Sequence, residues 1–146
     1  MKRVERSTVA VRRSRILVVD DYVPVAHAIA QLLRLSGHAV MTAFAADEVM
    51  NAARAFHPDV VLLDIGLRGP HDGVAVANWL REEPTFDSTL LVALTGRCDG
   101  EDDARIASAG FDYHLLKPVS FDELEAIIET APERSAAGPK GNSIAG

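Results

Sequence analysis

Residues 16–21 read ILVVDD: four apolar residues in a row run directly into two aspartates. A short apolar run without polar interruption is typical of a β-strand that is covered on both faces. Outward from this stretch, four more segments have strand character, and the sequence predicts strands at residues 39–43, 60–63, 90–94 and 113–116.

Segments with the periodicity of amphipathic helices lie between and after these strands. The first carries apolar residues at helical spacing from Ala26 to Leu33, and Gly37 can supply its left-handed stop. The last is predicted to begin at a capping box made of Ser120 and Glu123. The other helices are predicted at residues 46–56, 74–82 and 101–109.

Strands that alternate with helices imply a parallel sheet, because a parallel return needs a crossover connection, and right-handed crossovers place helices on both faces. The expected fold is therefore α/β: a five-stranded, doubly wound (βα)₅ sheet in a flavodoxin-like three-layer sandwich. In such sheets, ligands bind outside the carboxyl ends of the strands.

Length and composition fit one folded domain in 146 residues, of which 48% are hydrophobic. We assign it to residues 15–130, with residues 1–14 as a basic flexible leader and residues 131–146 as a disordered tail. The net charge of −6 combines a basic leader with an acidic body, since residues 16–130 hold 7 basic and 19 acidic side chains. This acidic body argues against nucleic acid as a partner. No apolar run is long enough to span a membrane, and the single cysteine, Cys98, favours a cytoplasmic location.

Polar side chains follow four of the predicted strands: Asp20, Asp21, Asp64, Thr95 and Lys117. Taken singly, each aspartate reads more simply as a helix N-cap, but the joint arrangement favours a chemical site. Carboxylates gathered at one edge repel one another, and a hard divalent cation (Mg²⁺ or Mn²⁺) relieves that repulsion. The hydroxyl and ammonium groups can neutralise a phosphoryl group, for which a carboxylate can serve as nucleophile.

Four segments stand in order along the chain: ILVVDD (16–21), PDVVLLDI (58–65), LTG (94–96) and LKP (116–118). With these segments, the chain from Arg15 to Thr130 resembles the response-regulator receiver domains of two-component signalling. The resemblance implies that Asp64 is the phosphoacceptor. It also implies a metal site in which Asp21 and Asp64 bind Mg²⁺, Asp20 does so largely through water, and the Gly66 carbonyl is a further ligand.

The resemblance further implies that Thr95 and Lys117 contact the phosphoryl oxygens, with Thr95 also acting in the conformational switch. The Lys117–Pro118 peptide bond is expected to be cis.

Three departures from the family pattern bear on the response. The switch position that usually carries Tyr or Phe holds His114, so an imidazole would have to move in place of an aromatic ring. Gly96 stands where Ala or Ser is usual, which opens access to the phosphoryl group. The loop from Asp64 to Gly73 is one residue longer than is typical, and Arg68 occupies a position where proline is common.

The expected function is a single-domain receiver without a DNA-binding output. A sensor or hybrid histidine kinase, or a phosphotransfer protein, would donate the phosphoryl group, and an unspecified protein would read it out. The face formed by the fourth predicted helix, the fifth strand and the last helix would change its affinity for that protein or for a second copy of the chain. Such a phosphoacceptor is not an enzyme beyond slow self-catalysed phosphotransfer and dephosphorylation.

Two other functions stay open. One is a binding module of the same fold that no longer uses phosphorylation. The other is a phosphatase of the haloacid-dehalogenase type, which also uses an aspartyl nucleophile and Mg²⁺. The sequence argues against the phosphatase because Asp20 and Asp21 are adjacent rather than spaced as Asp-x-Asp, and Gly66 stands where a second acid would follow Asp64.

Overall fold

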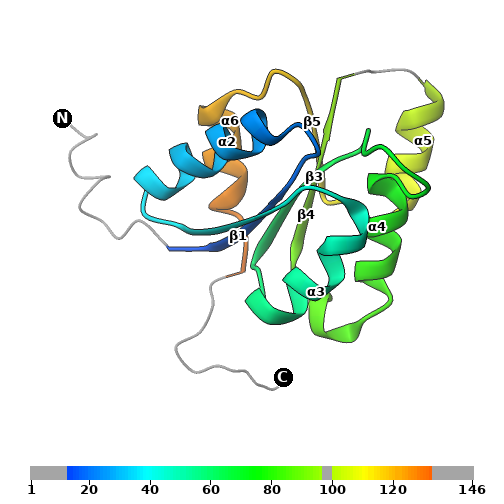
Figure 1. Cartoon of the computed structure of the whole chain (residues 1–146), viewed down its shortest axis with the longest axis horizontal. Coiled ribbons are helices and arrows are strands. Elements are labelled where there is room, and N and C mark those ends of the chain that lie inside the picture. The colour runs from blue at the N-terminus through cyan, green and yellow to red at the C-terminus, as the bar shows by residue number, and fades with distance from the viewer. Residues whose placement is uncertain (1–12, 97–99, 133–146) are drawn as a thin grey trace.

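The computed structural model describes residues 13–96 and 100–132, and their side chains except at positions 100–103. Five parallel strands form one sheet in the order β2-β1-β3-β4-β5, which is the predicted doubly wound architecture (Figure 1). Residues 1–12 of the predicted leader, residues 133–146 of the predicted tail, and Cys98 lie outside the described residues. The strands are β1 (Arg15–Val19), β2 (Ala39–Ala43), β3 (Val60–Asp64), β4 (Leu90–Thr95) and β5 (Tyr113–Leu116).

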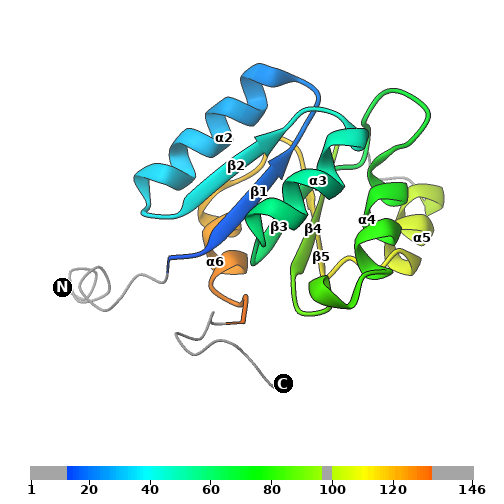
Figure 2. The same ribbon diagram turned by 60° about the horizontal axis from the view of Figure 1, so that its bottom comes forward.

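Helices cover both faces of the sheet. Helices α2 and α6 lie on one face, and α3, α4 and α5 lie on the other (Figures 1 and 2). The helices are α2 (Val23–Leu35), α3 (Ala46–Phe56), α4 (Gly73–Arg81), α5 (Gly100–Ser108) and α6 (Phe121–Ile128), with a 3₁₀ turn η1 (Pro84–Phe86).

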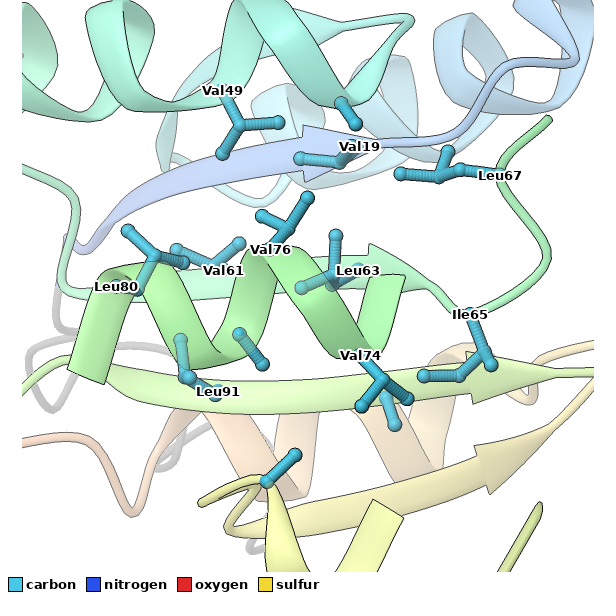
Figure 3. Packing of buried hydrophobic residues seen from close by; sticks show 14 of the residues in the cluster. Val19, Val49, Val61, Leu63, Ile65, Leu67, Val74, Val76, Leu80 and Leu91 are labelled. Atoms are coloured by element: carbon cyan, nitrogen blue, oxygen red, sulfur yellow. The ribbon is translucent and has the colours of Figure 1, made fainter. Parts of the chain in front are cut away.

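The apolar run of β3 shows why the strands lack polar alternation. Val61 and Leu63 belong to the core under α3, α4 and α5, whereas Val60 and Leu62 belong to the core under α2 and α6. All four side chains are fully buried, since each face of the strand meets a helical layer. Figure 3 shows the α4 side of this packing, where Val76 and other apolar residues of the helix lie over the strand.

Local signals in the sequence account for several helix ends. Gly37 has φ of 101° just beyond α2, and Ser120 Oγ accepts the Glu123 N–H at 3.3 Å at the start of α6. Helix α4 begins at Gly73, one residue earlier than predicted, because Asp72 caps it. The 3₁₀ turn η1 was not among the predicted elements.

Both ends of the described chain are packed against the domain. Ser14 is buried, and its carbonyl accepts the Ala39 N–H at 3.0 Å. Ala131 is also buried and belongs to the core that contains Leu124. The packed residues therefore reach from Ser14 to Ala131, one position beyond the predicted domain at each end.

Arg81, the last residue of α4, ties together segments at the amino-terminal edge of the sheet. Its Nη1 donates to the carbonyls of Phe86 and Thr89, each at 3.0 Å, and its Nε donates to the Gly110 carbonyl at 3.0 Å. Its Nη2 donates to Asp112 Oδ2 at 2.9 Å. This guanidinium thus joins α4 to the loops that enter β4 and β5.

Among the described residues, no helix combines the length and apolar character that crossing a bilayer would require. The cytoplasmic location stays a prediction.

The strand order reverses at β1 and β3, because β1 leads outward to β2 and β3 leads to β4 on the other side. A doubly wound sheet forms a crevice at this switch point, outside the carboxyl ends of its strands. A ligand site is therefore expected at the residues that end β1, β3, β4 and β5.

Candidate functional site

Three carboxylates meet at this switch point. Asp20 and Asp21 directly follow β1, and Asp64 is the last residue of β3. One carboxylate oxygen from each lies within 4.8 Å of the others. Asp20 is 1% exposed and Asp64 is 6% exposed, so two of the three carboxylates are almost removed from water. The structure thus brings together the acidic residues that the sequence predicted.

Lys117 supplies a cation between the two buried carboxylates. Its Nζ lies 3.2 Å from Asp20 Oδ2 and 3.2 Å from Asp64 Oδ1. The Lys117 backbone N–H donates to the Thr95 carbonyl at 2.8 Å, which ties the residue after β5 to the end of β4. The Lys117–Pro118 peptide bond is cis, in agreement with the expectation.

The electrostatics of this cluster set the ionisation of the carboxylates. Burial raises the pKa of Asp64, and the charge of Asp20 adds to that effect; the Gly66 N–H and Lys117 offset only part of it. Burial acts to lower the pKa of Lys117, but the charges of Asp64 and Asp20 raise it overall. Lys117 therefore stays protonated, and added positive charge would favour the ionised form of Asp64.

Asp21 has a different counter-ion. Its Oδ2 accepts the Arg68 backbone N–H at 2.8 Å and Arg68 Nε at 3.1 Å. Partial burial acts to raise the pKa of Asp21, but these contacts with Arg68, together with the charge of Lys117, lower it overall. Asp21 is therefore ionised at neutral pH.

The backbone of the loop after β3 holds Asp64 in place. The Gly66 N–H donates to Asp64 Oδ1 at 3.0 Å, and the Gly73 N–H donates to the Ile65 carbonyl at 3.1 Å. A β-carbon at Gly73 would lie 2.3 Å from the Asp64 carbonyl oxygen. Glycine at position 73 thus allows the start of α4 to approach the end of β3 this closely.

Thr95 and His114 lie on the same face of the sheet. Ala93 pairs with His114 across β4 and β5, and Thr95 is two residues after Ala93 on the same strand. Thr95 is 4% exposed, at the carboxyl end of β4. A β-carbon at Gly96 would meet no heavy atom within 4 Å. The register is compatible with the predicted switch pair, whose movement stays a prediction.

The donor set fits a hard divalent cation. All three side chains offer carboxylate oxygens, which Mg²⁺ and Mn²⁺ prefer, and no soft sulfur or imidazole ligand belongs to the described cluster. Asp20, Asp21 and Asp64 are the residues that would hold the ion. The Gly66 N–H donates to Asp64 Oδ1, so Gly66 lies beside the cluster. The Gly66 carbonyl as a metal ligand stays a prediction.

Two ion pairs beside the site were not predicted. Arg68 was noted only as a departure from the family pattern, and its bond to Asp21 joins positions 47 residues apart. Asp72 caps α4 and also pairs with Arg105 Nη2 at 2.7 Å. An aspartate before a helix indicates a helix cap, but the sequence does not show which arginine pairs with Asp21 or with Asp72.

Comparison with known proteins gives a consistent assignment. Residues 16–129 match the family model of the response regulator receiver domain. The transcriptional regulatory protein KdpE of Mycobacterium tuberculosis is 33% identical over 122 residues, which cover 84% of this chain and 52% of that protein. PrrA of Mycobacterium leprae, also a transcriptional regulatory protein, is 35% identical over 130 residues, which cover 88% of this chain and 54% of that protein. The chain thus spans about half the length of the curated relatives it matches.

Solved structures agree with the fold. A putative response regulator from Chloroflexus aurantiacus superposes with a TM-score of 0.74 at 26% identity, covering 81% of this chain and 96% of that one. A CheY-like response regulator receiver domain protein from Methanospirillum hungatei superposes with a TM-score of 0.72 at 27% identity, covering 80% and 92%.

Proposed function

This chain belongs to the response regulator receiver domain family, and on that premise we propose that Asp64 accepts a phosphoryl group from a phosphohistidine in a Mg²⁺-dependent reaction. The observation that carries the proposal is the cluster at the switch point of the sheet. Asp64 lies with Asp20 and Asp21 within reach of one cation, and Lys117 Nζ is 3.2 Å from its Oδ1.

The transfer needs an ionised Asp64. One of its oxygens attacks the phosphorus, the new P–O bond replaces the P–N bond, and the electron pair of that bond returns to the donor imidazole. Among the described residues, the contacts from Gly66 N and Lys117 Nζ both reach Oδ1, so we assign Oδ2 as the attacking oxygen. A bound Mg²⁺ or Mn²⁺ would supply positive charge that favours the ionised carboxylates and offsets charge on the phosphoryl oxygens.

Lys117 and Thr95 are the residues that we assign to the phosphoryl oxygens. Lys117 is joined to Asp64 before transfer and can contact the new group with a small movement. We expect Lys117→Ala to accept phosphate but to transmit little response. The measurement is partner binding with and without phosphorylation, and an unchanged gain in binding would contradict this role.

We assign the readout to the face of α5, β5 and α6. Strand β5 is at the edge of the sheet, where Tyr113 is 37% exposed and Leu116 is 49% exposed. Exposed apolar groups on an edge strand suit a protein partner or a second copy of this chain. His114 lies on this strand and on the same face of the sheet as Thr95, which connects the surface to the site.

The phosphoryl donor is a sensor or hybrid histidine kinase, or a phosphotransfer protein, since receivers of this family interact with histidine kinases. The matched relatives KdpE and PrrA are transcriptional regulators about twice as long as the matched segment. For this chain we propose readout through protein contacts, because the acidic composition disfavours binding to a phosphate backbone.

Incubation with a small acyl phosphate and Mg²⁺ tests the assignment. Mass spectrometry should show one added phosphoryl group, which should be lost in Asp64→Asn and when Mg²⁺ is chelated. Asp87→Asn is a matched control, because Asp87 is exposed and precedes β4 at the opposite edge of the sheet. No label from acyl phosphate or any histidine kinase would refute the proposal and favour the binding module, whereas repeated turnover of a phosphomonoester would favour the phosphatase.

A further inference from the structure

Arg68 lies in the loop between β3 and α4 and binds one of the proposed metal ligands. Its backbone N–H and its Nε both donate to Asp21 Oδ2, at 2.8 and 3.1 Å. We propose that the Arg68 guanidinium competes with the divalent cation for Asp21 and thereby weakens metal binding by the site. This inference rests on the proposed function, because it takes Asp21 as a metal ligand.

The charges of the described residues favour this competition. Lys117 contacts Asp20 and Asp64, and Arg68 contacts Asp21, so three carboxylates face two cations. With every group ionised, the cluster carries one net negative charge. A divalent cation entering beside both side chains would leave one net positive charge. If the Arg68 guanidinium departs, the cluster with its ion is neutral.

The hydrogen bonds of Asp21 also favour competition between Arg68 and a metal ion. An oxygen that accepts two hydrogen bonds has its lone pairs engaged, so a cation can bind Oδ2 only by displacing a donor. A cation on Oδ1 would share the carboxylate with the guanidinium and be repelled by it. At either oxygen, the ion competes with the Arg68 guanidinium for the Asp21 carboxylate.

The guanidinium can leave at a modest cost, and that cost sets the size of the competition. The Arg68 side chain is 78% exposed, whereas that of Asp21 is 18% exposed. An ion pair this open to solvent contributes little stability. The backbone N–H of Arg68 can keep its bond to Asp21 when the side chain turns into water, so the carboxylate keeps its orientation. The side chain alone is therefore the competing part.

Metal binding measured on the full chain tests the proposal. Free Mn²⁺ is followed by electron paramagnetic resonance, and Mg²⁺ binding by calorimetry. Arg68→Ala and Arg68→Gln should both bind the ions about two- to fivefold more tightly, the gain expected when the metal no longer has to displace an exposed ion pair from Asp21. Arg54→Ala is the matched control: it removes the same charge from an exposed ion pair with Glu83, and its affinity should stay unchanged.

The Asp21→Asn background separates competition from a general charge effect. In this background, Arg68→Ala should change the metal affinity by a factor close to one, because the carboxylate that Arg68 and the metal share is gone. Equal or weaker binding by both Arg68 variants would overturn the proposal, as would an undiminished gain in the Asp21→Asn background. If the wild-type chain binds neither ion, the metal site of the proposed function fails and this inference fails with it. A wild-type chain that binds metal while the Arg68 variants show no gain leaves the proposed function intact.

Discussion

Gly73 is the residue whose replacement should most directly disturb the end of β3. A β-carbon there would lie 2.3 Å from the Asp64 carbonyl oxygen and 2.8 Å from Ile65 Cα, where real contacts stay above 3.0 Å. Both atoms belong to the backbone, so no side-chain rotation relieves the overlap. Gly73→Ala must therefore displace α4 or the strand end that carries Asp64.

The cost can be bounded from these contacts. Overpacking of a tight site costs about 1–3 kcal/mol, and loss of the Gly73 N–H bond to Ile65 adds about 1 kcal/mol. The better helix propensity of alanine returns up to about 1 kcal/mol. The net loss should be about 1–3 kcal/mol in the free energy of unfolding, or a melting temperature lower by about 3–12 °C.

Urea unfolding followed by circular dichroism and by Trp79 fluorescence measures this loss. Gly96→Ala is the matched control at the same edge of the sheet, because its added β-carbon meets no heavy atom within 4 Å. Gly73→Ala should also weaken Mn²⁺ binding, since Asp64 moves with the backbone. A loss below about 1 kcal/mol, or one no larger than that of Gly96→Ala, would refute the steric reasoning.

Three further changes test the electrostatics and the packing. Asp64→Asn should melt a few degrees higher at pH 7 without metal, because burial and Asp20 raise the pKa of Asp64 and its ionised form costs stability. That advantage should shrink as the pH falls through the raised pKa, where the wild-type carboxyl takes up a proton, and a constant advantage in melting scans would contradict the assignment. Lys117→Ala leaves Asp20 and Asp64 without their shared cation. The melting temperature of this variant should fall, and Mg²⁺ should raise that temperature more in the variant than in the wild type. An equal rise in both proteins would contradict the role of Lys117 as the shared cation of the two carboxylates. Arg81→Ala should cost about 2–3 kcal/mol in urea unfolding, because carbonyls of the β4 and β5 entry loops lose their donor, and a cost near zero would show that water replaces it.

The sequence alone was sufficient for the order of strands and helices and for the residues at the strand ends. Uninterrupted apolar runs such as Val60–Leu63 predict strands buried on both faces, and the structure confirms the parallel sheet that they imply. Because parallel strands end at one edge of a sheet, the sequence predicted Asp20, Asp64 and Lys117 at the same edge. The strand order in the sheet, which the sequence does not give, is what brings Lys117 Nζ to 3.2 Å from both carboxylates. Local backbone chemistry also predicted the stop at Gly37.

Which side chains touch one another at that edge could not be predicted from the sequence. The pairing of Arg68 with Asp21 depends on the path of a loop, and the close approach at Gly73 depends on how α4 packs on β3. Contacts of this kind follow from the course of loops and the packing of helices, and the spacing of apolar residues does not predict them. Apolar patterning determines which face of an element is buried, whereas the positions of individual side chains follow from the packed backbone around them.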